Sequence, residues 1–291
     1  MIDATTAFPP ARGSSGERLA TAAVWSSALL VVGVSVWMLG GLFWQGAGRI
    51  NWAFLTTEPA NAGRSGGIAP MLASTVLVLG VALAVSVPLG LGAAVLLAEF
   101  TDSGSVFGRL VRRSLDVLAG VPSVVFALFG NALFCQYLGL GYSILAGGLT
   151  LACMVLPVLI RATEEGFRAV PEDYRRAAAA LGMSRTGTLW HVLLPAAAPG
   201  LAVGLVLGIG RVLGETAALL FTSGYVDRMP ESLLDSGRTL SVHIYDLSMN
   251  VTGGDANACA TAVVLVVLLL VVNAAAGWIA RHWMRGKRIS E

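Results

Sequence analysis

Six long apolar stretches dominate the sequence and restrict its fold more than any other feature. A helix that crosses a bilayer needs about 20 mostly apolar residues. Hydrophobic residues make up 56% of the chain and charged residues 12%, whereas soluble domains carry about 25% charged residues. The sequence therefore predicts an all-α, polytopic membrane protein with six transmembrane helices, at 19–44, 70–98, 115–138, 144–160, 196–222 and 258–280.

The positive charges alternate in step with these six stretches. Of the 19 Lys and Arg residues, 14 lie in segments that six crossings would place on one side of the membrane, and four lie on the other. Cytoplasmic segments carry an excess of Lys and Arg, so we expect both termini in the cytoplasm. This arrangement predicts a cytoplasmic tail at 1–18, a transmembrane domain at 19–280 and a second cytoplasmic tail at 281–291.

The segment 161–195 is basic, rich in alanine, and lies on the predicted cytoplasmic side. Pro171 suits the first turn of a helix, and the acidic pair Glu172 and Asp173 suits its positive end. Gly182 is a typical residue just past a helix. We therefore expect a short helix of about ten residues outside the membrane. Its alanine face would fit the groove of a partner or this chain's own cytoplasmic helix ends, and the residues alone favour neither.

Charged residues also occur inside the fifth apolar stretch. With a helix starting near Ala196, Arg211 lies roughly 22 Å along it, and a central Arg costs about 2.5–3.5 kcal/mol on insertion scales. Glu215 follows four residues later, on the same face of a continuous helix. Two interpretations remain open. One is an ion pair that locks helices together. The other is a polar lining of a translocation path, in which Arg211 binds an oxyanion beside Glu215 and Thr216.

The spacing within the cytoplasmic segment resembles the "EAA" signature of ABC importer permeases, which reads Glu-Ala-Ala, x3, Gly, x9, Ile-x-Leu-Pro. In this chain Arg176 replaces the Glu, and Val192 replaces the Ile. The resemblance implies a type I ABC importer permease fold. It also implies that the helix is a coupling helix seated in a cleft of a separate ATPase. The residues that it assigns to this coupling are Pro171, Arg176, Ala177, Ala178, Gly182, Leu194 and Pro195.

Four further stretches narrow the resemblance to PstA-type subunits of phosphate-specific ABC transporter permeases, at 66–70, 118–126, 211–217 and 240–245. This likeness implies an ATP-driven phosphate importer of the bacterial inner membrane. It implies three partners: a homodimer of ATP-binding subunits, a second homologous permease and an extracytoplasmic phosphate-binding protein. The family's intramembrane Arg and Glu carry over onto Arg211 and Glu215. The outer segment 223–257 is either a solvated connection or, as the family implies, the docking site for the binding protein.

Several kinds of chemistry find no support in the sequence. A P-loop needs G-x-x-x-x-G-K-[ST], but the only lysine is Lys287, which Arg288 follows. We expect no ATP hydrolysis, cofactor, metal site or nucleic-acid binding in this chain. The histidines lie in predicted loops or tails, and we expect them to be solvated. Two alternatives stay open: a permease for sulfate or molybdate, and a membrane scaffold or phosphate sensor that does not conduct.

Overall fold

Helices make up nearly all of the regular structure in the computed structural model, which describes residues 15–102 and 104–285. The two strands β1 (Pro59–Ala60) and β2 (Ser65–Gly66) form a short antiparallel hairpin. The predicted all-α class is thus confirmed apart from this hairpin. The helices are α1 (Ser15–Gly46), η1 (Ala47–Arg49), α2 (Trp52–Thr56), η2 (Asn61–Gly63), α3 (Ala69–Glu99), α4 (Val106–Ala119), α5 (Ser123–Gly130), η3 (Asn131–Tyr137), α6 (Ile144–Arg168), α7 (Glu172–Ala180), α8 (Arg185–Thr188), η4 (Leu189–Leu193), α9 (Leu194–Gly214), α10 (Ala217–Leu220), α11 (Leu240–Met249) and α12 (Asp255–Arg285).

Each of the six predicted spans has a counterpart among the described residues. Five are helices long and apolar enough to cross a membrane: Leu19–Arg49, Ala69–Glu99, Ile144–Arg168, Arg185–Gly214 and Asp255–Trp278. The sixth is a pair of helical segments, Val106–Ala119 and Ser123–Tyr137. Most of the two predicted tails, including Arg12 and Lys287, lies outside the described residues.

The third span was predicted as one helix at 115–138, but the structure has two helical segments there. Its two parts are bent by 101°, and the bend follows the C-cap residue Gly120. Pro122 has an extended ψ of 145° and stands immediately before α5. Proline lacks an N–H and disfavours the helical conformation in the residue before it, so the helix ends here and restarts in a new direction.

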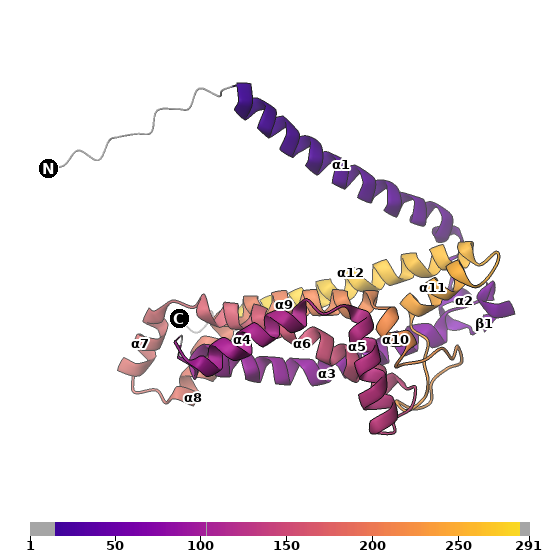
Figure 1. The fold of residues 1–291 in the computed structure, drawn as a ribbon. Coiled ribbons are helices and arrows are strands. Elements are labelled where there is room, and N and C mark those ends of the chain that lie inside the picture. Colours follow the sequence, from indigo (N-terminus) through magenta and orange to yellow (C-terminus); the bar gives the residue numbers. More distant parts are fainter. Residues whose placement is uncertain (1–14, 103, 286–291) are drawn as a thin grey trace.

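The long helices α3, α6, α9 and α12 lie along one common direction (Figure 1). α7 and α8 lie at one end of this bundle, and α2, α11 and the hairpin lie at the other, while α5 runs across it (Figure 1). α1 extends away from the bundle, and its described side chains are largely exposed (Figure 1). Its last residue, Gly46, meets α12, where an added Cβ would lie 2.6 Å from the Cys259 carbonyl oxygen.

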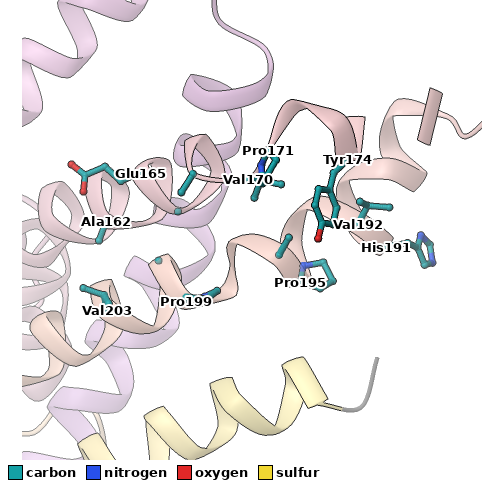
Figure 2. A pocket seen from close by; sticks show the side chains of 14 residues that line it. Ala162, Glu165, Val170, Pro171, Tyr174, His191, Val192, Pro195, Pro199 and Val203 are labelled. Carbon is teal, nitrogen blue, oxygen red and sulfur yellow. The ribbon is translucent and has the colours of Figure 1, made fainter. Parts of the chain in front are cut away.

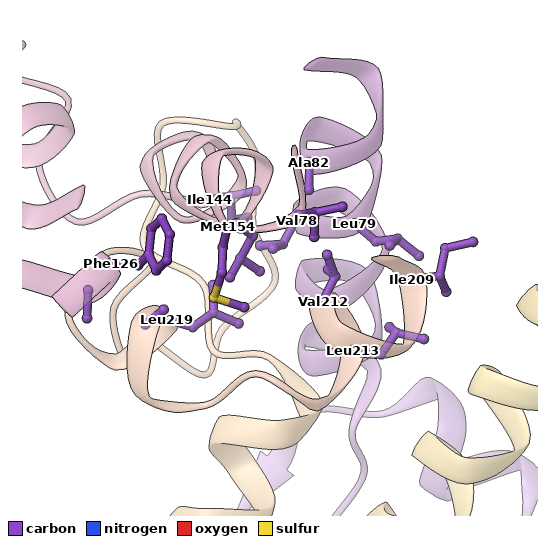
Figure 3. Close-up of a cluster of buried hydrophobic side chains, with 14 of the residues drawn as sticks. Val78, Leu79, Ala82, Phe126, Ile144, Met154, Ile209, Val212, Leu213 and Leu219 are labelled. Atoms are coloured by element: carbon purple, nitrogen blue, oxygen red, sulfur yellow. The ribbon is translucent and has the colours of Figure 1, made fainter. Parts of the chain in front are cut away.

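The main hydrophobic core joins α3, α5, α6, α9 and α10 (Figure 3). It includes Val78 and Leu79 of α3, Met154 of α6 and Val212 of α9. α6 and α9 come closest at two glycines, because a Cβ on Gly200 would lie 2.4 Å from the Cα of Gly166. Small residues allow helix backbones to approach closely in a membrane, and Gly204 and Gly208 of α9 likewise lie close to Leu159 and Val155 of α6.

Candidate functional site

The fifth span is interrupted beside the predicted intramembrane charges. α9 ends at Gly214, and Glu215 is extended, with φ −77° and ψ 129°. Helical structure resumes only in the four-residue α10. The predicted continuous helix at 196–222 is therefore wrong at its end. It is also too short at its start, because the span begins at Arg185.

Hydrogen bonds stabilise the interruption at Glu215. Its Oε1 accepts a hydrogen bond from the Ala218 N–H at 3.1 Å, and its carbonyl oxygen accepts one from the Ser241 hydroxyl at 2.6 Å. Backbone polar groups released by a helix break in a membrane need partners inside the protein. The side chain of Glu215 and the Ser241 hydroxyl of α11 provide such partners, so these two bonds explain why the chain unwinds here.

Arg211 lies in the last turn of α9, and its side chain is half-buried. Within residues 15–102 and 104–285 it forms no hydrogen bond or ion pair, so the structure contains no Arg211–Glu215 bridge. A positive charge near a helix C-terminus is stabilised by about 0.3–1 kcal/mol, which is less than the insertion cost of a central Arg. Glu215 and Thr216, which follow the end of α9, are also half-buried. The three predicted residues therefore flank one helix break.

α11 joins this break to the end of the bundle that carries α2 and the hairpin (Figure 1). Its residue Leu240 donates its N–H to Thr75 Oγ1 of α3 at 2.9 Å. Arg238, just before α11, pairs with Asp246 at 3.0 Å, and its guanidinium carbon lies 4.2 Å from the centre of the Tyr225 ring. Arg238 and Asp246 are each only 8% exposed. Much of the outer segment is thus a folded unit rather than a solvated connection.

His243 of α11 is buried, so its predicted solvated state is wrong. Burial, and after it the nearby Arg238 charge, lower the pKa of His243 to about 4 against the opposing effects of Asp246 and Asp227. Burial disfavours the charged imidazolium. The residue is therefore a neutral part of the outer fold near pH 7. His191 is exposed as expected, and nothing is described for the side chain of His282.

The predicted short helix after Pro171 is present as α7. Pro171 immediately precedes it, and Gly182 has φ +72° just after it. The Gly182 N–H bonds to the Ala179 carbonyl at 3.0 Å, and the Met183 N–H bonds to the Ala178 carbonyl at 3.0 Å. This pair of bonds is a Schellman motif, in which glycine accepts the left-handed conformation without strain. The prediction of Gly182 as the stop is therefore confirmed.

The described residues leave the alanine face of α7 mostly uncovered. Ala178 is the one buried residue of α7, while Arg176, Ala177 and the alanines that follow Ala178 are exposed. Leu181, at its end, is 81% exposed. The other two predicted coupling residues lie further along the chain. Leu194 is buried in a cluster with Phe167 and Val170, and Pro195 is half-buried.

Cavities separate α7 from the bundle. One, of about 1030 Å³, lies between the end of α6, α7 and the start of α9 (Figure 2). Its lining includes Glu165, Pro171, Tyr174, His191 and Pro195. A second, of about 430 Å³, is lined by residues of α7 and α8 and by the end of α3. Tyr174 borders the first cavity, and Arg175 and Ala179 border the second.

A buried carboxylate that the sequence analysis did not identify links α4 to α6. Glu164 is 2% exposed, and its Oε1 lies 2.7 Å from Arg112 Nε and 3.0 Å from Arg168 Nε. Arg112 also donates to the Leu97 carbonyl at the end of α3, at 2.8 Å. Removing one partner of a buried ion pair is strongly destabilising. The spacing of Glu164 four residues before Arg168 was a signal that could have revealed part of this cluster.

Comparison with known proteins shows the family to which this sequence belongs. The family described as "Binding-protein-dependent transport system inner membrane component" matches residues 86–288. The chain belongs to this family. Its match includes α7 and the break after α9, but it begins within α3 and so leaves out α1 and the hairpin. The chain is therefore a multi-pass inner-membrane protein and a transport component rather than an enzyme.

Two relatives extend the likeness over more of the chain. The "Probable ABC transporter permease protein YqgI" of Bacillus subtilis (strain 168) is 34% identical over 278 residues, which cover 90% of this chain and 94% of the relative. The "Phosphate transport system permease protein PstA 1" of Mycobacterium tuberculosis (strain H37Rv) is 36% identical over 227 residues, or 77% of this chain and 73% of the relative. The resemblance to PstA-type permeases is thus confirmed.

Two solved transporters share the fold of this binding-protein-dependent permease. One imports the acidic polysaccharide alginate; the TM-score is 0.60 with 16% identity, over 89% of this chain and 96% of the other. The other is the MetNI methionine ABC transporter in an inward-facing conformation, with a TM-score of 0.55 and 20% identity, over 75% and 94% of the two chains. At these identities the likeness concerns the fold alone, and the predicted type I ABC importer permease fold is confirmed.

Proposed function

We propose that this chain is a permease subunit of an ATP-driven importer of inorganic phosphate and forms half of the translocation path. The observation that carries the proposal is the half-buried Arg211, which has no partner among the described residues and stands where α9 is interrupted. Broken helices at membrane depth form substrate sites in many transporters. The phosphate named for the PstA relative gives the substrate class.

The chemistry of the break suits a partly protonated oxyanion. The planar guanidinium of Arg211 stays charged and can donate two parallel hydrogen bonds to phosphate oxygens. Glu215 Oε1 already accepts from Ala218, while its other oxygen is available to accept from a P–OH group. Thr216 adds a hydroxyl beside it. The Glu215 charge also keeps the anion from binding too tightly to be released.

The energy would come from a homodimer of ATP-binding subunits at the cytoplasmic face. The uncovered residues Arg176 and Ala177 of α7 would contact its cleft, while Pro171 and Gly182 fix the two ends of the helix. Ala178 and Leu194 are buried, so they would support the helix from the side of the bundle. Pro195 borders the cavity between α7 and the bundle.

The remaining partners follow from the same assignment. A second homologous permease would complete the path, and an external phosphate-binding protein would dock on the folded outer segment around α11. Both termini would lie in the cytoplasm. The predicted tail at 1–18, the membrane domain at 19–280, with its coupling segment at 161–195, and the tail at 281–291 form part of this proposal.

Transport assays on the assembled complex in liposomes test the function. We expect Arg211→Ala to lower the uptake of radiolabelled phosphate by at least about tenfold, the factor that corresponds to 1.4 kcal/mol and a modest value for a charged hydrogen bond. Glu215→Ala should also lower it. Arg64→Ala, which removes an exposed arginine near the hairpin, serves as the control and should transport normally.

The uptake of each variant is compared with that of the wild type at equal membrane abundance and equal co-purification of the other subunits. Normal uptake by the Arg211 variant would remove the proposed substrate contact. Equal competition by unlabelled sulfate or molybdate would assign a different oxyanion. A complex that alters phosphate-dependent gene regulation but imports no anion would be a sensor rather than a permease.

A further inference from the structure

The two adjacent arginines of α7 differ in their surroundings. Arg176 is exposed, whereas the side chain of Arg175 is only 23% exposed and pairs with Glu99 at the end of α3. Arg175 Nη2 lies 2.5 Å from Glu99 Oε1, and Arg175 Nε lies 3.1 Å from Glu99 Oε2. This bidentate geometry is the strong, directional form of an Arg–carboxylate pair.

Arg175 also bonds to the backbone in the last turn of α6 and just after it. Its Nη2 donates to the Phe167 carbonyl at 3.1 Å, and its Nη1 donates to the Val170 carbonyl at 3.0 Å. The Phe167 carbonyl also accepts from the Val170 N–H at 3.3 Å, so the guanidinium adds a second bond there and ties down the turn that leads from α6 to α7. One side chain thus joins α7 to the ends of two membrane helices.

Little else fastens α7 to the bundle. Ala178 is its one buried residue. Tyr174 lines the larger of the two flanking cavities, and Ala179 lines the smaller. In the part of the chain that the structure describes, Arg175 makes the only side-chain hydrogen bonds from α7 to other helices.

α3 and α6, which Arg175 contacts, connect α7 to the helix break after α9. α3 and α6 pack together in the main core with α9, whose last turn carries Arg211. The end of α3 is held a second time, through the Arg112 and Glu164 pair. A displacement of Glu99 is therefore passed to rigidly packed helices rather than to a loop.

We propose that Arg175 and Glu99 are positioning residues that transmit the movement of α7 to α3 and α6. The inference rests on the proposed coupling role of α7. It divides two roles between adjacent residues: Arg176 would face the ATPase, and Arg175 faces the membrane helices. α7 has its own ends fixed by Pro171 and Gly182. Without the Arg175–Glu99 pair, α7 stays folded and docks, but it moves independently of the membrane helices.

The decisive measurement is phosphate imported per ATP hydrolysed by the full complex in liposomes. We expect Arg175→Gln and Glu99→Gln each to lower this ratio by at least about tenfold, from the loss of a charge-assisted hydrogen bond. The ATPase should co-purify in normal amounts, and the exchanged pair Arg175→Glu with Glu99→Arg should recover part of the ratio. Arg176→Gln is the contrasting variant, and it should reduce ATPase binding.

Two results would overturn the inference. One is an unchanged ratio in the single variants. The other is loss of the ATPase from the Arg175 variant, which would mean that this residue serves docking or folding instead. The exchange tests the ion pair itself, because it restores opposite charges at these two positions while the bonds of Arg175 to the Phe167 and Val170 carbonyls stay lost.

A second readout does not depend on the substrate. Spin labels at Ala180 of α7 and at the exposed Leu96 of α3 report their separation, after replacement of Cys135, Cys153 and Cys259. Arg175→Gln should broaden a distance distribution that is narrow in the complex with native Arg175, and an unaltered distribution would contradict the inference. If the complex imports no phosphate but the labels behave as expected, the proposed substrate fails and the mechanical link stands.

Discussion

Ser241 of α11 donates a hydrogen bond of 2.6 Å to the carbonyl oxygen of Glu215, the residue at which α9 unwinds. The bond spans 26 positions in the sequence and links the outer segment to the proposed substrate site. An external partner that moves α11 would therefore act on Glu215 through one direct contact. Ser241 is itself only 7% exposed, so water cannot easily replace it.

Ser241→Ala should weaken the helix break. A carbonyl left without a partner costs about 1–3 kcal/mol, so we expect a lower thermal midpoint of the purified complex and a raised KM for phosphate. Ser248→Ala is the matched control, because Ser248 is exposed on the same helix. Equal behaviour of the two variants would show that the bond has no role.

The stability of the outer segment should fall in mild acid because of His243. Its folded-state pKa of about 4 lies below the ordinary 6.5, so the unfolded chain binds a proton that the folded chain does not between these values. The stabilisation is complete above about pH 6.5 and is lost as the pH falls toward 4, by up to about 3 kcal/mol.

Thermal unfolding in detergent from pH 7 to pH 4.5 measures this effect. Neutral His243→Gln removes the titrating group that faces Arg238 and Asp246, so its pH slope should be smaller than that of the wild type. If the two slopes coincide, carboxylates rather than His243 control the acid sensitivity.

Gly200→Ala should disrupt the contact of α6 with α9. The added Cβ would lie 2.4 Å from the Gly166 Cα, and overpacking in a tight core costs about 1–3 kcal/mol. Reduced membrane abundance of folded protein is the expected result. Gly80→Ala on α3 is the control, since no atom lies within 4 Å of a Cβ there; a comparable loss in both variants would argue against the packing explanation.

Gly182→Ala should loosen the end of α7. A non-glycine residue at φ +72° is strained, at a cost of about 1 kcal/mol or more, and the helix end would fray. We expect weaker co-purification of the ATPase. Gly182→Asn should be milder, because asparagine tolerates this conformation better than alanine. Identical retention of the ATPase by both variants would contradict this role.

Much of the fold followed from the sequence, because local patterns decide it. Apolar length and charge alternation predicted the six spans, and Pro171 and Gly182 predicted the ends of α7. The helix break at Glu215 was missed, since no local residue forbids a helix there. Its cause is the long-range bond from Ser241 together with the cap to Ala218, and neither is visible in a linear pattern.

The site was predicted in part for the same reason. Arg211 and Glu215 are conspicuous as charges in an apolar stretch. Arg175 appeared only as one positive charge among several, because its partner Glu99 lies 76 positions away. A half-buried pair of this kind becomes apparent only when the fold brings the ends of α3 and α6 beside α7.

The helix α1 lies apart from the packed helices, so its stability depends on its surroundings, whereas theirs depends on the core. Its described surface is almost wholly uncovered, and it joins the rest at Gly46 and through the neighbouring Arg49, which bonds to Asn257 of α12 at 2.9 Å. Lipid or another subunit, rather than the core, must supply its apolar surroundings. Substitutions along its length should consequently alter insertion into the bilayer, while the packed permease body keeps its own cooperative unfolding.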